Sequence, residues 1–202
     1  MKQPLPLKII GVGRYLPQRI VPSSEVEKLC QLPAGWIERN NGVRERRWVD
    51  ETETNSFMGA EAAKEALADA GLAPTDIDLI INASGSYEQA IPDTAPLIQR
   101  HLGLGNSGIP CLTIHATCLS FLVALDMCAS LLASGRYRHI LLVTAEIASI
   151  GLNPSEPESA SLLGDAAAAV ILTLTPTGEK SGLCTARLET YGDGAYYTQV
   201  SG

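Results

Sequence analysis

The stretch from Ile109 to Ser134 reads IPCLTIHATCLSFLVALDMCASLLAS, and it decides the fold. Its first part, Ile109–Ala116, is an apolar run of strand length. Its second part, Leu119–Ser134, is apolar on nearly every side of a helix and stops before Gly135. A helix that is apolar all round belongs in the centre of a protein. The pattern therefore predicts a buried strand and a buried helix, with Cys118 at the turn between them.

Strand-like and helical patterns alternate through the rest of the chain, and no repeat or Gly/Ser-rich linker divides it before about residue 175. Strands are expected at Leu7–Val12, Ile77–Ala83, Ile109–Ala116, His139–Ala145 and Ala166–Thr175, and helices at Ser23–Cys30, Gly59–Ala70, Thr94–Leu102 and Leu119–Ser134. Apolar strands without alternation are typical of a sheet that helices cover on both faces. We therefore expect an α/β fold with a mostly parallel five-stranded sheet and right-handed crossovers.

Two local patterns near the start of the chain have a structural interpretation. Ser23 or Ser24 is expected to cap the first helix, with Glu27 placed for a capping box. Gly11-Val12-Gly13 lacks the third glycine of a dinucleotide fingerprint, and no helix follows it directly. A nucleotide-binding turn is therefore not expected there.

Composition excludes several classes of protein. The 202 residues are 46% hydrophobic and 18% charged, as in a globular chain with a real core. A formal net charge of −7 argues against a nucleic-acid partner, because phosphate binding needs clustered Lys and Arg. No apolar run reaches the roughly 20 residues that span a bilayer, and Met1-Lys2-Gln3-Pro4 lacks the apolar core of a signal peptide. We expect a cytoplasmic protein without a membrane segment.

The chain has five cysteines, Cys30, Cys111, Cys118, Cys128 and Cys184. Their spacing forms no C-x-x-C pair, and no histidine completes a zinc set, so reduced thiols and no metal are expected. Most of them should pack as small hydrophobic side chains. The three histidines, His101, His115 and His139, are also interpreted as structural.

Cys118 is the exception among the thiols because of its place at the start of a helix. Unpaired backbone N–H groups and the positive end of the helix dipole stabilise a thiolate there, and the same groups can receive an oxyanion. Apolar burial acts in the opposite direction and raises the pKa of a thiol. From the local sequence alone, a catalytic and a structural role for Cys118 both remain open.

Four segments resemble those of β-ketoacyl-acyl carrier protein synthase III, a family of thiolase-fold condensing enzymes, in the same order along the chain. They are Ile9-Ile10-Gly11-Val12-Gly13-Arg14-Tyr15-Leu16-Pro17, Gly35-Trp36-Ile37 through Gly42-Val43-Arg44-Glu45-Arg46, His115-Ala116-Thr117-Cys118-Leu119-Ser120-Phe121, and Gly164-Asp165-Ala166-Ala167-Ala168-Ala169. The resemblance covers nearly the whole chain. It implies a thiolase-like fold, of which this chain is the amino-terminal half.

The resemblance also implies a two-step acyl transfer in fatty acid or polyketide-type synthesis. Cys118 would attack an acyl-CoA and hold the acyl group as a thioester. A malonyl thioester on acyl carrier protein would then lose carbon dioxide, and its carbanion would attack the acyl-cysteine. Acyl-CoA is thus a substrate, and the reaction needs neither a metal nor a redox cofactor.

The resemblance implies roles for four further residues. Trp36 would stack on the adenine of CoA, and Arg39 would contribute to CoA binding. Ile91 would reach across a dimer interface into the partner's acyl pocket, and Leu163 would line a wall of that pocket. Aliphatic residues at these two positions would leave room for a longer or branched acyl chain.

The chain departs from the family pattern at several positions. Asn40 and Pro157 stand where the family has arginines, and Ala166 and Ala168 stand where it has glycines. A basic rim is one interpretation of the arginines near Trp36, and a plain solvated face is the other, because two glutamates are interleaved with them. The residues of this group are Arg39, Arg44, Arg46, Arg47, Glu38 and Glu45.

The resemblance divides the chain into residues 1–175, the half that carries the nucleophile, and residues 176–202, the truncated start of a second half. In the family, a histidine and an asparagine of the second half stabilise the charge that forms as carbon dioxide leaves, and no histidine follows His139 here. We therefore expect the 202 residues alone to be unable to condense malonyl thioesters. The strand Ile109–Ala116 resembles the family's dimer strand, so a two-fold homodimer is expected.

Two alternatives remain open at this point. Related thiolase-fold enzymes use the same cysteine for head-to-head condensation of two acyl chains or for simple acyl transfer. The chain could also be a non-catalytic half of a split enzyme, which shapes a partner's pocket.

Overall fold

The central sheet has five strands in the order β1-β7-β6-β4-β5 in the computed structural model, which describes residues 4–197. Their bounds are Lys8–Tyr15 for β1, Leu79–Asn82 for β4, Cys111–Thr113 for β5, His139–Glu146 for β6 and Ala166–Thr173 for β7. β4 is parallel to β5 and β6, whereas β7 is antiparallel to β1 and β6. The α/β fold is as predicted, but the sheet is mixed and not mostly parallel.

The connection from β6 to β7 explains this difference. A parallel pair needs a crossover, usually a helix that packs back across the sheet. Residues 147–165 instead form only the 3₁₀ turn η3 (Ser149–Gly151) and the short helix α6 (Pro157–Ala160), and they pack against residues 41–49 at the end of the sheet. The chain therefore re-enters the sheet at the end where it left, and β7 runs back along β6.

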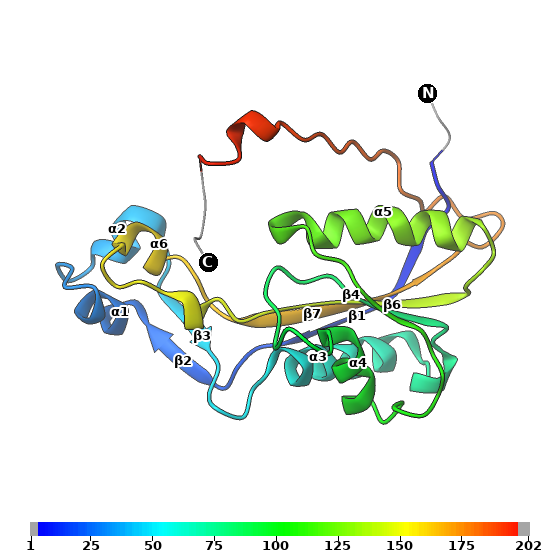
Figure 1. Cartoon of the computed structure of the whole chain (residues 1–202), viewed down its shortest axis with the longest axis horizontal. Coiled ribbons are helices and arrows are strands. Elements are labelled where there is room, and N and C mark those ends of the chain that lie inside the picture. The colour runs from blue at the N-terminus through cyan, green and yellow to red at the C-terminus, as the bar shows by residue number, and fades with distance from the viewer. Residues whose placement is uncertain (1–3, 198–202) are drawn as a thin grey trace.

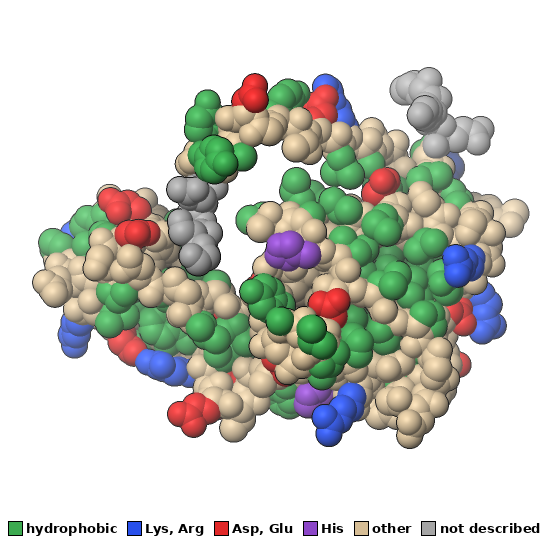
Figure 2. Space-filling model, viewed as in Figure 1, with side chains coloured by type: hydrophobic (Ala, Val, Ile, Leu, Met, Phe, Trp, Pro, Cys, Tyr) green, Lys and Arg blue, Asp and Glu red, His purple; other side chains and the backbone are tan. Residues whose placement is uncertain are grey.

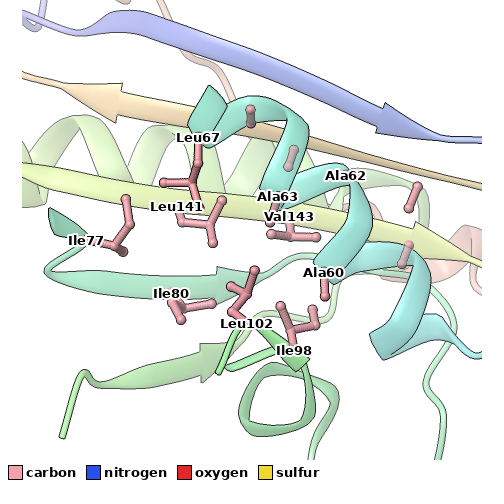
Figure 3. Packing of buried hydrophobic residues seen from close by; sticks show 14 of the residues in the cluster. Ala60, Ala62, Ala63, Leu67, Ile77, Ile80, Ile98, Leu102, Leu141 and Val143 are labelled. Carbon is pink, nitrogen blue, oxygen red and sulfur yellow. The ribbon is translucent and has the colours of Figure 1, made fainter. Parts of the chain in front are cut away.

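Helices cover both faces of the sheet (Figure 1). α3 (Asn55–Ala70) and α4 (Thr94–His101) lie on one face, and α5 (Ser120–Ala133) lies on the other. Figure 3 shows the first of these interfaces, where small residues of α3 pack against larger aliphatic side chains of β4, β6 and α4. Its labelled members are Ala60, Ala62, Ala63, Leu67, Ile77, Ile80, Ile98, Leu102, Leu141 and Val143.

α5 is buried on one side only in the described part of the chain. Ala124, Cys128 and Leu132 face the sheet, whereas Leu122 and Met127 are exposed. Within residues 4–197, the apolar pattern on the outer side of this helix is therefore left uncovered, as expected if a further part of the fold packs there. Figure 2 shows hydrophobic side chains over α5, with an open space between them and the segment that arches above.

Gly11 and Gly13 of β1 allow α3 to lie very close to the sheet. A Cβ atom on Gly11 would lie 2.2 Å from the carbonyl oxygen of Ala66, and one on Gly13 would lie 2.2 Å from that of Ala62. Real Cβ atoms do not approach other atoms so closely. The Gly-Val-Gly motif therefore serves helix packing, in agreement with its rejection as a nucleotide-binding turn.

The two edge strands of the sheet differ. On β1, the backbone N–H of Val12 donates to the carboxylate of Asp69 at 2.9 Å, and that of Arg14 donates to Glu65 at 2.6 Å. Both acceptors belong to α3, so this helix satisfies donors that a further strand would need. Within residues 4–197, β5 pairs with β4 on one side and has no strand on the other.

A smaller lobe stands at the end of the sheet and was not predicted. It contains the two-stranded sheet β2 (Arg19–Pro22) and β3 (Glu45–Trp48), with the helices α1 (Ser23–Leu29), α2 (Trp36–Asn41) and α6. Its core is the cluster of Val21, Val26 and Ile37.

The predicted cap of α1 is wrong. Pro22 occupies the cap position, and no side chain caps the helix. The hydroxyl of Ser23 donates instead to the carbonyl of Val43 at 2.6 Å. Glu27 accepts from the backbone N–H groups of Gly35 and Ile37, which tie α2 to α1, so tertiary partners compete successfully for both side chains.

The other elements lie close to their predicted positions. α3 begins at Asn55, before the predicted Gly59, because Thr54 caps it by accepting from the N–H of Phe57 at 3.3 Å. β5 is shorter than predicted, with three residues. The remaining elements are the 3₁₀ turns η1 (Pro74–Asp76), η2 (Thr117–Leu119) and η4 (Gly192–Gly194). Among the described residues, no helix is both long and apolar enough to cross a bilayer.

Candidate active site at Cys118

Cys118 lies in the turn η2, between the end of β5 and the start of α5, as the sequence predicted. Its side chain is exposed in the described part of the chain. Thr117, which precedes it, has a φ of 49°, in the left-handed region that non-glycine residues seldom adopt. The turn thus presents a thiol at the carboxyl end of a parallel strand, where α/β proteins commonly place reactive groups.

The loop after β4 forms a wall beside this turn. A Cβ on Gly85 would lie 3.5 Å from the carbonyl carbon of Thr117, which is ordinary van der Waals contact. Glu146, the last residue of β6, holds the loop by accepting from the N–H groups of Gly85 at 2.5 Å and Ser86 at 2.8 Å. Sequence analysis missed this clamp, although a glutamate at the end of an otherwise apolar strand was a visible sign of it.

A cavity of about 250 Å³ lies in the same region. Its lining residues are Ser84, Ser86, Tyr87, Gln89, Ala90, Asp93, Thr113 and His115. The Nδ1 atom of His115 lies 3.2 Å from the carbonyl oxygen of Ser84. His115 is thus engaged with the backbone of the wall, which agrees with its structural interpretation.

The other two histidines also have local partners. The Nδ1 atom of His139 lies 3.0 Å from the carbonyl oxygen of Asp76, and the ring of His101 meets that of Phe57 edge-on, with 6.2 Å between centroids. Both arrangements agree with structural roles.

Three other thiols are partly or fully buried. Burial raises the pKa of Cys111 to about 11 and that of Cys128 to about 12, and it also raises the pKa of Cys30. Only a thiolate is a good nucleophile, so these three thiols are poorly reactive near neutral pH. Cys118 and Cys184 are the exposed thiols among the five, and Cys184 lies on an irregular segment.

Alkylation should therefore separate the thiols by pH. At pH 8 we expect iodoacetamide to modify Cys118 and Cys184, and to leave Cys111 and Cys128 unmodified because they stay protonated below their raised pKa values. The modification of Cys111 should rise as the pH approaches 11. Peptide mass spectrometry after timed quenching measures each site. Equal rates at Cys111 and Cys118 at pH 8 would contradict this assignment.

Trp36 and Arg39, the predicted CoA-binding residues, lie together on α2. Trp36 is half-buried and packs against the core of the small lobe. Arg39 is exposed, and its Nη1 donates to the carbonyl oxygen of Ala34 at 3.2 Å. The Glu27 carboxylate fixes the start of this helix by accepting hydrogen bonds from the N–H groups of Ile37 and Gly35. These bonds hold the pKa of Glu27 below its usual value.

The arginines near Trp36 do not form the basic rim that was one of two interpretations. Arg44 is paired with Glu38 at 2.8 Å, and Arg47 donates to the carbonyl oxygen of Pro17 at 2.8 Å. Arg46 is buried and donates to the carbonyl oxygen of Ser161 at 3.0 Å. These three guanidinium groups have partners elsewhere in the chain, whereas Arg39 lies on the same helix as Trp36 and bonds locally, to Ala34.

The two predicted acyl-pocket residues lie in different environments. Ile91 is 87% exposed, on the loop after β4 that borders the cavity, and it is not one of the lining residues. Leu163 is partly exposed, and its carbonyl oxygen accepts from Nε1 of Trp48 at 3.4 Å. The described contacts do not bring these two side chains together.

Comparison with known proteins agrees with this geometry. A family model described as 3-Oxoacyl-[acyl-carrier-protein (ACP)] synthase III matches residues 112–192, which include the turn at Cys118. The chain is similar to β-ketoacyl synthase III. The synthase III of Rickettsia massiliae is 38% identical over 165 residues, which are 82% of this chain and 51% of the relative. That of Aquifex aeolicus is 36% identical over 188 residues, 93% of this chain and 59% of the relative.

Solved structures of synthase III share the fold. The crystal structure from Aquifex aeolicus VF5 has a TM-score of 0.78 and 37% identity, and the alignment covers 84% of this chain and 54% of that one. The structure from Pseudomonas aeruginosa PAO1 has a TM-score of 0.79 and 28% identity, with 88% and 53% covered. The chain thus has the thiolase-like fold of these enzymes. It spans about half the length of the synthase III relatives that it matches.

Proposed function

We propose that this chain carries the nucleophile of a synthase III-like acyltransferase. The Cys118 thiolate attacks the carbonyl carbon of an acyl-CoA, and the CoA thiolate leaves. A malonyl thioester on acyl carrier protein then loses carbon dioxide, and its carbanion attacks the acyl-cysteine. The β-ketoacyl thioester forms on the carrier protein as the Cys118 thiolate leaves, in fatty acid or polyketide-type synthesis. The exposed thiol on a structured turn at the start of α5 carries this proposal.

In this proposal, different residues of the chain bind different parts of the acyl-CoA substrate. Trp36 and Arg39 on α2 bind CoA, with the indole as a flat apolar surface and the guanidinium as a cation for its phosphates. Leu163 and, from a second copy, Ile91 line the acyl pocket. The exposure of Ile91 supports this assignment, because a side chain that reaches into a partner is bare in a single copy.

Part of the site lies outside the described residues in this proposal. Residues 1–175 are the half that carries the nucleophile, and residues 176–202, of which 198–202 lie outside the described residues, open a second half that supplies the donors for decarboxylation. The bare side of α5 and the coverage of only about half of each relative support this division. We also propose a cytoplasmic location, because all five thiols are free and reducing compartments keep thiols in that state.

Intact-mass spectrometry tests the function. The protein is incubated with acyl-CoA, and the mass should rise by one acyl group. A chase with malonyl-acyl carrier protein should remove that group and give a β-ketoacyl carrier protein when the complementary half is present. Condensation of two acyl-CoA molecules without malonyl thioester would favour the head-to-head reaction. No acylated protein in the presence of that half would favour a non-catalytic chain.

We further propose a homodimer through the open edge of β5. Leu112 on this strand is 45% exposed, and Ile9 on the opposite edge strand is 46% exposed. Lysine on an edge strand disfavours pairing with another strand. We therefore expect Leu112→Lys to convert a dimer to a monomer in sedimentation velocity at micromolar concentration, and the matched control Ile9→Lys to leave the dimer intact. A monomeric wild type would contradict the proposal.

A further inference from the structure

The left-handed conformation of Thr117 needs support from its neighbours. A β-branched residue at a φ of 49° is sterically disfavoured, and such a residue persists only where its surroundings hold it. In residues 4–197, Gln31 is the only other non-glycine residue with a positive φ. Because Thr117 directly precedes Cys118, the backbone conformation of Thr117 sets the direction in which the Cys118 side chain points.

Ser120 supplies that support with one hydroxyl. Its Oγ accepts from the N–H of Ala116 at 2.9 Å and donates to the carbonyl oxygen of Thr117 at 2.6 Å. The carbonyl oxygen of Ser84 lies farther away, at 3.3 Å. A hydroxyl has one proton to donate, so Ser120 donates to the nearer of the two carbonyl oxygens, that of Thr117. The two bonds therefore join the chain on both sides of the strained residue.

The environment makes these bonds effective. Ser120 is only 2% exposed, so water does not compete for its hydroxyl. The wall of Ser84 and Gly85 also lies against Thr117, and Glu146 clamps that wall. If the hydroxyl were removed, the N–H of Ala116 would lose its acceptor at a partly buried position.

We propose that Ser120 is a positioning residue for Cys118. It keeps Thr117 left-handed and so holds the exposed thiol of Cys118 in one orientation at the turn before α5. Ser120 does not touch the substrate in this proposal. The assignment rests on the proposed function only for the chemical role of Cys118, because the effect on the thiol itself can be measured without any acyl donor.

A double-mutant cycle with Thr117 tests the proposal. The readout is the rate constant for alkylation of Cys118 by iodoacetamide at pH 8, divided by that of Cys184 in the same sample. The thiolate attacks the methylene carbon, iodide leaves, and the thiol proton goes to water. We expect Ser120→Ala to lower this ratio about fivefold, the effect of losing one buried hydrogen bond. In the Thr117→Gly background the same change should lower it less than about twofold, because glycine adopts a positive φ without steric cost.

The matched control is Ser130→Ala, on the same helix. Its hydroxyl also bonds to a backbone carbonyl, that of Asp126 at 3.3 Å, but far along α5 from the turn. This variant should leave the ratio unchanged. A purely structural role of Ser120 would give the same effect in both backgrounds, so equal effects, or no effect of Ser120→Ala, would overturn the proposal.

Folding of each variant is checked by circular dichroism. If Ser120→Ala alone does not fold, the double variant Thr117→Gly/Ser120→Ala is compared with Thr117→Gly. If the double variant folds and its alkylation ratio is within about twofold of that of Thr117→Gly, the proposal is supported, because glycine then removes the need for the hydroxyl. A double variant that also fails to fold overturns it. The two proposals can fail separately. If the mutant cycle shows coupling but the wild type never forms an acyl-cysteine, the positioning role of Ser120 stands and the proposed function is refuted.

Discussion

The Cys118→Ala variant is expected to take up no acyl group from acyl-CoA. Cys118 is the exposed thiol on the turn before α5, whereas burial raises the pKa of Cys111 to about 11 and that of Cys128 to about 12. Both buried thiols therefore stay protonated and cannot replace it. Labelling with radioactive acyl-CoA, followed by peptide mapping, measures the loss. Label that maps to Cys111 or Cys128, or persists in Cys118→Ala, would refute the assignment.

Cys184→Ala is the matched control for this experiment. Cys184 is exposed like Cys118, but it lies on an irregular segment with no helix start beside it. Its removal should leave acylation at the wild-type level. If exposure alone were sufficient for acylation, each of the two variants would keep part of the label, and neither would abolish it.

Gly13→Ala should cause the largest loss of stability among single changes to β1. The added Cβ would lie 2.2 Å from the carbonyl oxygen of Ala62 and 2.4 Å from the N of Ala66, both on the backbone of α3. Because a helix backbone cannot rotate away, α3 must shift from the sheet and its small-residue interface must open. We expect a loss of about 3 kcal/mol in the free energy of unfolding, measured by urea denaturation.

Gly105→Ala controls for the substitution itself. A Cβ on Gly105 would meet nothing within 4 Å, and its φ is not in the left-handed region. This variant should stay within about 0.5 kcal/mol of the wild type, as surface changes usually do. If Gly13→Ala changed the free energy of unfolding as little as Gly105→Ala, the result would contradict the close approach of α3 to β1.

Local patterns predicted most of the fold because its elements carry strong local signals. Apolar runs marked β4 and β6, and Gly71 and Gly135 marked the ends of two helices. The direction of β7 could not be predicted, since Ala166–Thr173 has the same composition whichever way it runs. Its direction depends on residues 147–165, which bind residues 41–49 through Ser161 and Asp165, and such distant partners leave no mark in a local pattern.

The site was predicted unevenly for a similar reason. The position of Cys118 could be predicted because a strand pattern and a helix pattern meet beside it in the local sequence. The supports of its turn could not, because Ser84, Ser120 and Glu146 come from three separate elements and meet only in the folded chain. The predicted cap of α1 failed in the same way. Ser23 donates to the distant carbonyl of Val43. Glu27 accepts from the distant N–H groups of Gly35 and Ile37, so both side chains are taken from the helix start.

The two carboxylates that cover the outer edge of β1 also limit how large an assembly can grow. A sheet with two open edges can add copies at both ends, and such growth has no natural stop. With Asp69 and Glu65 occupying backbone donors at β1, the proposed pairing between copies has β5 as its open edge. Two copies related by a two-fold axis would use both of their β5 edges at once and leave none for a third. If the proposed dimer forms, α3 would therefore also limit edge-to-edge growth, because it occupies donors on the one sheet edge that the dimer leaves outside.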